Sequence, residues 1–498
     1  MRTKKSIRNV GVMLLTQFIT LVLSFASRTV FIKTLGSEYL GFNGLFANIL
    51  NGLSLAEMGI GTAISYALYK PVAENNTELI KSLLAFYRKC YLVIGLFIIC
   101  AGFLLIPFLP YLIKDAITAP VNITQIYLCF LANSSFVYFF AHNRIIIDIS
   151  QNKYITNAVD FAGKTMVSIV QIFILLKFHN YMFFLYVQII GTIASTLIIK
   201  IIAGKKFPYI KEKCDVIPID LKKKIWNDIS ILFLFRIGTM AMVASDFVLI
   251  SAFVGISQAG IYSNYTLIVN TISLFIYLFV SGTAASIGNA IVSLDKDNLY
   301  EIFERISFFV FCISGISMVC LLNLLNPFIE LWVGNAFVLQ HSVAVAISIN
   351  FFFMQNRILL ITFKQNAGIF RPDRYKPLIE IIFNFGLSII LVKYYGILGV
   401  LIGSIANILF VCICPEAYII HKYLFYRSHW IYAKSYFIQI LVLLIACITS
   451  LYINSFVENF VVKCLVSIFV SIFIYLLFLY RTREFKYFIR IVKKFYIH

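Results

Sequence analysis

Charged side chains interrupt several apolar runs of this sequence that are twenty or more residues long. Arg28, Lys164 and Arg236 are cations within such runs, and Glu57 and Asp246 are carboxylates. A charge at the centre of a lipid bilayer costs roughly 2.5 to 3.5 kcal/mol even on insertion scales, so the charges found there usually face a partner or a wet cavity. We therefore expect either internal ion pairs or a cationic, water-accessible pathway that can hold an anion.

The spacing of these charges predicts two layers across the membrane. With a helical rise of 1.5 Å per residue, Arg28 and Asp246 both fall about 10 to 12 Å from the outer face, where they could oppose each other. Glu57, Lys164 and Arg236 fall about 13 to 17 Å from the inner face. Glu57 is a candidate for proton coupling or gating, although neutralisation of Arg236 explains it equally well.

Two further charged pairs recur in both halves of the chain, nearer the cytoplasmic ends of their helices. They are Arg144 with Asp160 and Arg357 with Glu380. A long arginine side chain can hold its head group near the interface and meet a carboxylate of a neighbouring helix. We expect both to be structural ion pairs.

The elements that must position these charges are membrane-spanning helices. The chain has 498 residues, of which 61% are hydrophobic and 13% charged, more apolar than a soluble domain of this length requires. A soluble enzyme is excluded, and the fold class is an all-α integral membrane protein. Long apolar runs predict fourteen transmembrane helices. They lie near residues 10 to 35, 40 to 68, 90 to 113, 121 to 147, 155 to 177, 181 to 203, 227 to 254, 259 to 292, 306 to 334, 340 to 363, 375 to 393, 397 to 420, 435 to 453 and 460 to 480.

Basic residues are distributed unequally between alternate loops. Of the 42 Lys and Arg residues, 32 lie in one set of loops, Lys364 and Lys376 among them, and five lie in the other set. Because cytoplasmic loops carry an excess of Lys and Arg, both termini are expected in the cytoplasm. The net charge of +20 is therefore mainly a topology signal, aided by anionic membrane lipids. We expect no nucleic-acid partner, since the basic residues do not gather on one folded face.

An internal repeat relates the two halves of the chain. The motif GSEYLG at residues 36 to 41 returns as GISQAG at 255 to 260, and four more matches follow in the same order at offsets between 212 and 221. Each repeat holds six spans, so the two lobes share one orientation and a pseudo-twofold axis along the membrane normal. The predicted domains are an N-terminal lobe at 1–203, a basic cytoplasmic linker at 204–226, a C-terminal lobe at 227–424, and two additional helices with a basic tail at 425–498.

No motif of the sequence indicates a metal or a cofactor. Cys412 and Cys414 form a C-x-C pair on an apolar helix, but two ligands without a third or fourth do not make a metal site. We expect them to pack as small apolar side chains. A glycine-rich phosphate loop followed by Lys and Ser or Thr does not occur, so ATP hydrolysis by this chain is not expected.

The amino-terminal third carries motifs that resemble a known family. The run LGFNGLF at 40 to 46, followed by LSLAEMGIG at 53 to 61 and YKP at 69 to 71, resembles bacterial polysaccharide-biosynthesis flippases of the Wzx type. The fourteen-span, two-lobe plan of the whole chain is similar to that family, within a superfamily that also holds MATE multidrug exporters and the lipid II flippase.

The resemblance implies a function, a partner and a location. The function is translocation of an undecaprenyl-diphosphate-linked oligosaccharide from the inner to the outer leaflet of the bacterial cell (inner) membrane, by alternating access, during capsule, O-antigen or exopolysaccharide biosynthesis. By its position on the first span, Arg28 is similar to the arginine that such flippases use in a cationic cavity, with Arg236 and Lys164 as further substrate-binding residues. A polysaccharide polymerase and glycosyltransferases are the expected protein partners.

Two other functions were weighed against this one. A MATE-like, cation-coupled multidrug exporter would be expected to use acidic cavity residues, whereas cations outnumber carboxylates three to two in the two charged layers. A membrane-bound polymerase or ligase commonly has a large external loop with catalytic residues, whereas the outer loops here are only about 3 to 8 residues long. We therefore expect a transporter rather than an enzyme.

Overall fold

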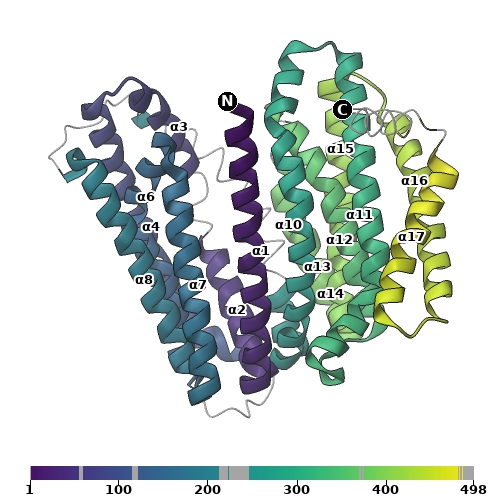
Figure 1. The fold of residues 1–498 in the computed structure, drawn as a ribbon, viewed down its shortest axis with the longest axis horizontal. Helices are drawn as coiled ribbons and strands as arrows, with labels where there is room; N and C mark the ends of the chain where they lie inside the picture. Colours follow the sequence, from purple (N-terminus) through teal and green to yellow (C-terminus); the bar gives the residue numbers. More distant parts are fainter. Residues whose placement is uncertain are drawn as a thin grey trace. The chain divides into compact units, whose positions relative to one another are not determined.

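The computed structural model describes residues 2–54, 60–114, 122–211, 222–223, 246–369, 372, 375–480, 482 and 485. Every regular element within these ranges is a helix (Figure 1), so the predicted all-α class is confirmed. The chain divides into two compact units, Met1–Gly260 and Ile261–His498. The predicted boundaries of the two lobes and of the linker at 204–226 stay predictions, and much of that linker lies outside the described ranges.

In the first unit, the described residues up to Lys206 form eight α-helices, several of which continue into short 3-10 or π turns. These helices are α1 (Arg2–Leu35), α2 (Ser37–Leu53), α3 (Ile60–Ala73), α4 (Thr77–Leu105), α5 (Ile123–Phe136), α6 (Ala141–Ile147), α7 (Lys153–Phe178) and α8 (Tyr181–Lys206). The short turns are η2 (Ile106–Leu112), η3 (Val137–Phe140), η4 (Asp148–Asn152), η5 (Pro208–Lys211) and η6 (Ile250–Val254). Helix α1 packs against α7 and α2.

Most of the second unit consists of α-helices, the longest of which are α10 and α11. They are α10 (Ile256–Ser293), which begins at the end of the first unit, α11 (Lys296–Val333), α12 (His341–Asn366), α13 (Lys376–Tyr395), α14 (Ile397–Ala406), α15 (Cys414–Ile420), α16 (His429–Asn454) and α17 (Phe460–Leu479). Shorter turns are η7 (Asn335–Phe337), η9 (Asn407–Ile413) and η10 (His421–Phe425). The stretch Ile397–Phe425 runs through α14, η9, α15 and η10 as one span.

Twelve helices in the described part of the chain are long and apolar enough to cross a membrane. They correspond one by one to twelve of the fourteen predicted spans. The predicted span at 40 to 68 contains α2 and α3, of 17 and 14 residues, on either side of the undescribed residues 55–59. Most of the predicted span at 227 to 254 lies outside the described ranges. The chain is a multi-pass membrane protein.

Polar side chains fix where several of these helices begin. The Oδ1 atom of Asn122 accepts hydrogen bonds from the backbone N–H groups of Thr124 and Gln125, and Asn180 caps α8 in the same way. The first N–H groups of a helix have no partner within the helix, so an Asn at this position stabilises its start. The caps explain why α5 and α8 begin where they do.

In the first unit, glycines of α2 allow close packing against residues 246–260. A Cβ atom on Gly41 would lie 2.1 Å from the carbonyl oxygen of Ile256, and one on Gly44 would lie 2.1 Å from Cζ of Phe247. Gly260 has the same relation to the carbonyl oxygen of Ser37, again at 2.1 Å. Close approach of the backbones therefore requires glycine at Gly41 and Gly260, whereas Gly44 leaves room for the ring of Phe247.

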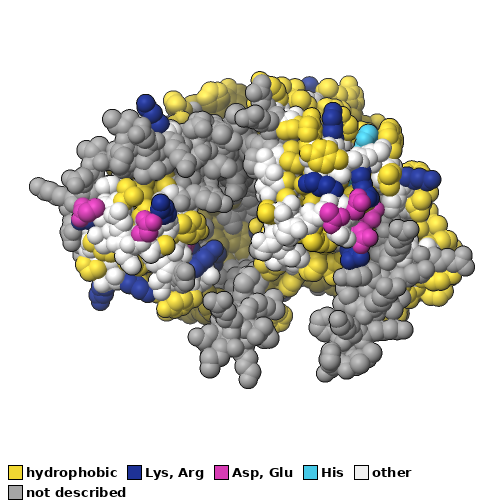
Figure 2. Space-filling model, turned by 90° about the horizontal axis from the view of Figure 1, so that it is seen from above, with side chains coloured by type: hydrophobic (Ala, Val, Ile, Leu, Met, Phe, Trp, Pro, Cys, Tyr) yellow, Lys and Arg dark blue, Asp and Glu magenta, His cyan; other side chains and the backbone are white. Residues whose placement is uncertain are grey.

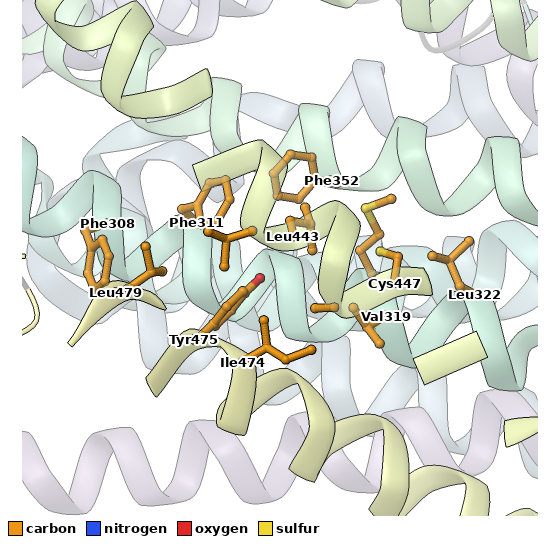
Figure 3. Packing of buried hydrophobic residues seen from close by; sticks show 13 residues of the cluster. Phe308, Phe311, Val319, Leu322, Phe352, Leu443, Cys447, Ile474, Tyr475 and Leu479 are labelled. Atoms are coloured by element: carbon orange, nitrogen blue, oxygen red, sulfur yellow. The ribbon is translucent and has the colours of Figure 1, made fainter. Parts of the chain in front are cut away.

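In the second unit, an apolar cluster joins α16 and α17 to α11 and α12 (Figure 3). Phe311 of α11, Leu443 of α16 and Tyr475 of α17 meet in it, all nearly fully buried. A Cβ atom on Gly315 would lie 2.0 Å from the Tyr475 hydroxyl, so α17 can approach α11 only because residue 315 is glycine. The two additional C-terminal helices are thus tightly packed parts of this unit.

Figure 2 shows Lys and Arg side chains beside Asp and Glu side chains on the described surface of each unit. At the first turn of α4, Lys81 Nζ lies 2.6 Å from Glu78, and at the start of α11, Asp297 accepts a 2.6 Å hydrogen bond from Arg427. Within each unit, the pair lies at a helix end next to a loop that is predicted to be cytoplasmic.

Candidate functional site

The structure describes three of the five charges predicted to act on substrate, coupling or gating. Arg28 is half-buried on α1, Asp246 is half-buried in the segment that precedes η6, and Lys164 is exposed on α7. Arg236 and Glu57 lie outside the described residues. The opposition of Arg28 and Asp246 and the layer formed by Arg236, Lys164 and Glu57 therefore stay predictions.

The first unit brings the predicted pair Arg144 and Asp160 together. Arg144 on α6 donates from Nη1 to Oδ1 of Asp160 on α7 at 3.2 Å, and its Nη2 contacts Oδ2 of the same carboxylate. Asp148 lies 3.9 Å from Nε of Arg144 and accepts a 2.6 Å hydrogen bond from the buried Thr156 hydroxyl. One guanidinium thus meets two carboxylates at the junction of α6, η4 and α7.

The second unit brings Arg357 and Glu380 together in the same way but in a fully buried place. Arg357 on α12 donates from Nη2 to Glu380 Oε1 on α13 at 2.7 Å. It also donates to both oxygens of Glu416 on α15, from Nη2 at 3.1 Å and from Nε at 3.2 Å. The exposed fractions of Arg357, Glu380 and Glu416 are 5%, 2% and 0%. Two-point guanidinium-carboxylate contact of this kind is strong and directional.

Two buried lysines complete this arrangement. Lys364 Nζ lies 3.7 Å from Glu416 Oε1, and Lys376 Nζ contacts the same oxygen and lies 3.4 Å from Glu380 Oε1. We call Arg357, Lys364, Lys376, Glu380 and Glu416 the buried charge cluster. Its three cations and two carboxylates tie α12, α13 and α15 together, and loss of either carboxylate would leave buried cations without compensation.

Three members of the buried charge cluster were missed by the sequence prediction. Lys364 and Lys376 are expected in a cytoplasmic loop, whereas the structure places them on α12 and α13. Glu416 lies within the predicted span at 397 to 420. A lone carboxylate in an apolar run is itself a signal of a buried cationic partner, and it could have identified Glu416.

Metal binding finds no support in the described part of the chain. No group of three His, Cys, Asp or Glu side chains there is placed to hold a metal ion. Cys412 is buried and donates from Sγ to Glu380 Oε1 at 3.1 Å, whereas Cys414 is exposed. The two members of the C-x-C pair therefore lie in different environments.

Comparison with known proteins places this arrangement in a known fold. No protein-family model matches the sequence, and no curated protein is significantly similar to it. The solved structure of the lipid II flippase MurJ in its inward closed conformation matches with a TM-score of 0.67 at 17% identity, over 94% of this chain and 99% of the flippase. A multidrug resistance MATE family transporter of the MOP superfamily matches in its inward-facing conformation with a TM-score of 0.59 at 13% identity, over 81% of this chain and 94% of the transporter. The chain has the fold that these two proteins share.

The matched structures differ in the share of this chain that they cover. An outward-facing MATE structure, with a TM-score of 0.54 at 14% identity, covers 82% of this chain and 93% of its own. The flippase covers 94% of this chain, which is 12 percentage points more.

Proposed function

We propose that this protein is a flippase that carries an undecaprenyl-diphosphate-linked oligosaccharide from the inner to the outer leaflet by alternating access. The observation that carries the proposal is the extent of the MOP-fold match, which includes 99% of a flippase for a lipid-linked substrate. The MATE structures are also nearly complete in the match, but they leave more of this chain uncovered. The length of the chain therefore favours the flippase over the exporter.

The chemistry of the substrate fits the charges of the first helix. A diphosphate is an anion that cannot cross hydrocarbon without compensation, and a guanidinium offers it paired, charge-assisted hydrogen bonds. Arg28 is half-buried on α1, between the uncharged residues Ser27 and Thr29. In our proposal Arg28, Arg236 and Lys164 hold the diphosphate, and Asp246 and Glu57 act in coupling or gating.

The membrane potential provides a direction for this movement. The predicted topology places both termini on the cytoplasmic side of the bacterial cell membrane. In our proposal the substrate is an anion that moves from this side to the outer side. Moving one negative charge out of an inside-negative compartment is favourable by about 2.3 kcal/mol of free energy per 100 mV. The lipid tail stays in the bilayer, and the protein makes no covalent change to the substrate. Glycosyltransferases that build the oligosaccharide and a polymerase that uses it are the proposed partners.

Translocation in liposomes tests the proposal. The purified protein is reconstituted with lipid-linked oligosaccharide extracted from its own cells, and sugar in the outer leaflet is measured by oxidation with periodate, which does not cross the bilayer. We expect Arg28→Ala to reduce the initial rate at least tenfold. Lys33→Ala, which removes an exposed cation from the same helix, is the matched control and should keep the rate. Equal rates for Arg28→Ala and wild type would contradict a role for Arg28 in holding the diphosphate.

A multidrug exporter is the second candidate, because MATE structures share the fold. It predicts that a strain lacking the protein becomes sensitive to cationic drugs. The flippase proposal instead predicts loss of a surface polysaccharide with unchanged drug sensitivity. The two phenotypes separate the candidates without knowledge of the sugar.

A further inference from the structure

A polar cavity lies in the second unit, at the end opposite to the predicted cytoplasmic loops. Its volume is about 340 Å³, and it is lined by the last turns of α11 and α16 and the first turns of α12 and α17. Leu322 belongs both to its wall and to the apolar cluster of Figure 3, so the cavity begins where that cluster ends. Pockets for small ligands commonly have volumes of about 300 to 1,000 Å³.

Hydrogen bonds hold the amide side chains of the cavity wall in fixed positions. Asn323 donates to the Ser450 hydroxyl at 3.0 Å, and Asn454 donates to the hydroxyls of Ser450 and Ser467 at 3.2 and 3.0 Å. Asn326 accepts from the Tyr265 hydroxyl at 2.8 Å and donates to the carbonyl of Leu339 at 3.0 Å. The amides are therefore oriented before any ligand arrives, which reduces the entropic cost of binding.

Two acceptors of this wall lack the partner that the protein would ordinarily give them. Oδ1 of Asn454 accepts no hydrogen bond from the described residues, although the side chain is only 5% exposed. Pro327 lies inside α11 and has no N–H, so the helix cannot make its usual bond to the carbonyl of Asn323. Buried acceptors are nearly always satisfied by protein, water or ligand. A ligand that donates hydrogen bonds would satisfy both acceptors.

The charged groups of the wall do not favour one sign of charge. Glu330 and Lys463 both line the cavity, together with His341. A carboxylate disfavours an anion, and an ammonium group disfavours a cation. Hydroxyl groups both donate and accept, so a neutral polyhydroxyl compound can bond to the carboxylate, the ammonium group and the amides together.

An aromatic group flanks the same region. The ring of Phe328 lies 5.8 Å from that of Trp332 and 6.1 Å from that of Phe460, which joins α11 to the start of α17 next to the cavity. Aromatic rings beside a few fixed polar groups are typical of small-molecule sites. The edge of a sugar ring carries hydroxyls that can bond to the polar wall of the cavity, and these rings lie on α11 and α17 beyond that wall.

We propose that this cavity is a saccharide subsite that holds sugar of the translocated oligosaccharide at the outer end of the second unit. The identity of the ligand rests on the proposed flippase function, since that function supplies a sugar at this side. The subsite gives α16 and α17 a role, because Asn454, Ser455 and Lys463 of its wall come from them and the loop between them.

Saturation-transfer NMR on the full-length protein in nanodiscs tests the subsite. The probe is the free glycan released by mild acid from lipid-linked oligosaccharide of the protein's own cells, without lipid or diphosphate. We expect saturation transfer to its sugar protons, reduced at least fivefold by Ser455→Leu, which fills the cavity, and by Glu330→Gln. Ser428→Leu changes an exposed serine just before the first residue of α16 and should leave the signal unchanged.

Each result decides between the alternatives. A cavity that holds only water gives no transfer to the glycan and overturns the subsite, as does an unchanged signal in Ser455→Leu. Binding of intact lipid-linked oligosaccharide without binding of free glycan also overturns it, because the lipid or the diphosphate is then what is recognised. If the glycan binds but the liposome assay shows no translocation, the flippase function fails and the saccharide site stands. If translocation proceeds without glycan binding, only the subsite fails.

Discussion

The hydroxyls of Ser37 and Ser257 lie 2.7 Å apart and form a hydrogen bond. The two residues are separated by 220 positions, which is within the offsets that relate the two copies of the sequence repeat. Ser37 comes one residue after Gly36, whose φ angle is 86°, and Ser257 comes two residues after Gly255, whose φ angle is 146°. The contact therefore joins the first residue of α2 to the second residue of α10, at positions that the sequence repeat predicts to be equivalent.

This contact predicts a conformational lock. If the ends at Ser37 and Ser257 separate during transport, the double variant Ser37→Cys, Ser257→Cys should be active when reduced and inactive when oxidised to a disulfide. Liposome translocation before and after oxidation measures the effect, and each single cysteine variant is its control. Full activity of the crosslinked protein would mean that the two ends stay together throughout transport.

Replacing a glycine of α2 by alanine is expected to change stability in opposite directions at two positions. Gly41→Ala places a Cβ 2.1 Å from the backbone oxygen of Ile256, and overpacking of this kind costs about 1 to 3 kcal/mol. Gly52→Ala meets nothing within 4 Å and gains helix propensity worth about 0.5 to 1 kcal/mol. The unfolding temperature in detergent should therefore fall for Gly41→Ala and rise slightly for Gly52→Ala. An unchanged unfolding temperature for Gly41→Ala would show that residue 256 does not pack on α2 at this point.

The buried charge cluster predicts a large effect from a small change. Glu416→Gln leaves Arg357, Lys364 and Lys376 with one carboxylate, and breaking a buried ion pair typically costs about 3 to 5 kcal/mol. Glu301→Gln breaks the exposed pair with Arg305 and should cost less than about 1 kcal/mol. Denaturant unfolding compares the two. Similar small losses would indicate that water reaches the cluster.

The packing of α17 on α11 predicts a rescue. Gly315→Ala puts a Cβ 2.0 Å from the Tyr475 hydroxyl, so it should lower stability. Tyr475→Phe removes that hydroxyl, which forms no hydrogen bond within the described chain, and should be nearly neutral. The double variant should recover most of the stability that Gly315→Ala loses. Additive losses in a double-mutant cycle would place the strain elsewhere.

Apolar run length predicted most of the fold, because a span must be about 20 apolar residues long. It failed at helix ends that extend beyond the hydrocarbon. The predicted spans begin at 90 and 306, whereas α4 begins at Thr77 and α11 at Lys296, after the caps Asn76 and Asp295. Charged residues such as Lys81 and Arg305 lower the mean hydropathy of these first turns, although the chain is helical there.

The candidate site was less predictable from the sequence than the fold. Arg144 and Arg357 could be paired with carboxylates because each stands out within or beside an apolar run. Lys364 and Lys376 look like ordinary loop charges, and only the return of α15 beside α12 buries them against Glu416. The cavity near Asn454 depends on four helix ends that come together in space, and no local sequence pattern encodes that.

The most direct test of the account compares two substrates in one preparation of liposomes. Lipid-linked oligosaccharide from the protein's own cells and a fluorescent cationic drug are supplied together, and the movement of each is followed under an inside-negative potential and under a proton gradient. The account predicts protein-dependent translocation of the oligosaccharide, accelerated by the potential, and no protein-dependent movement of the drug. Transport of the drug with no movement of the oligosaccharide would contradict it.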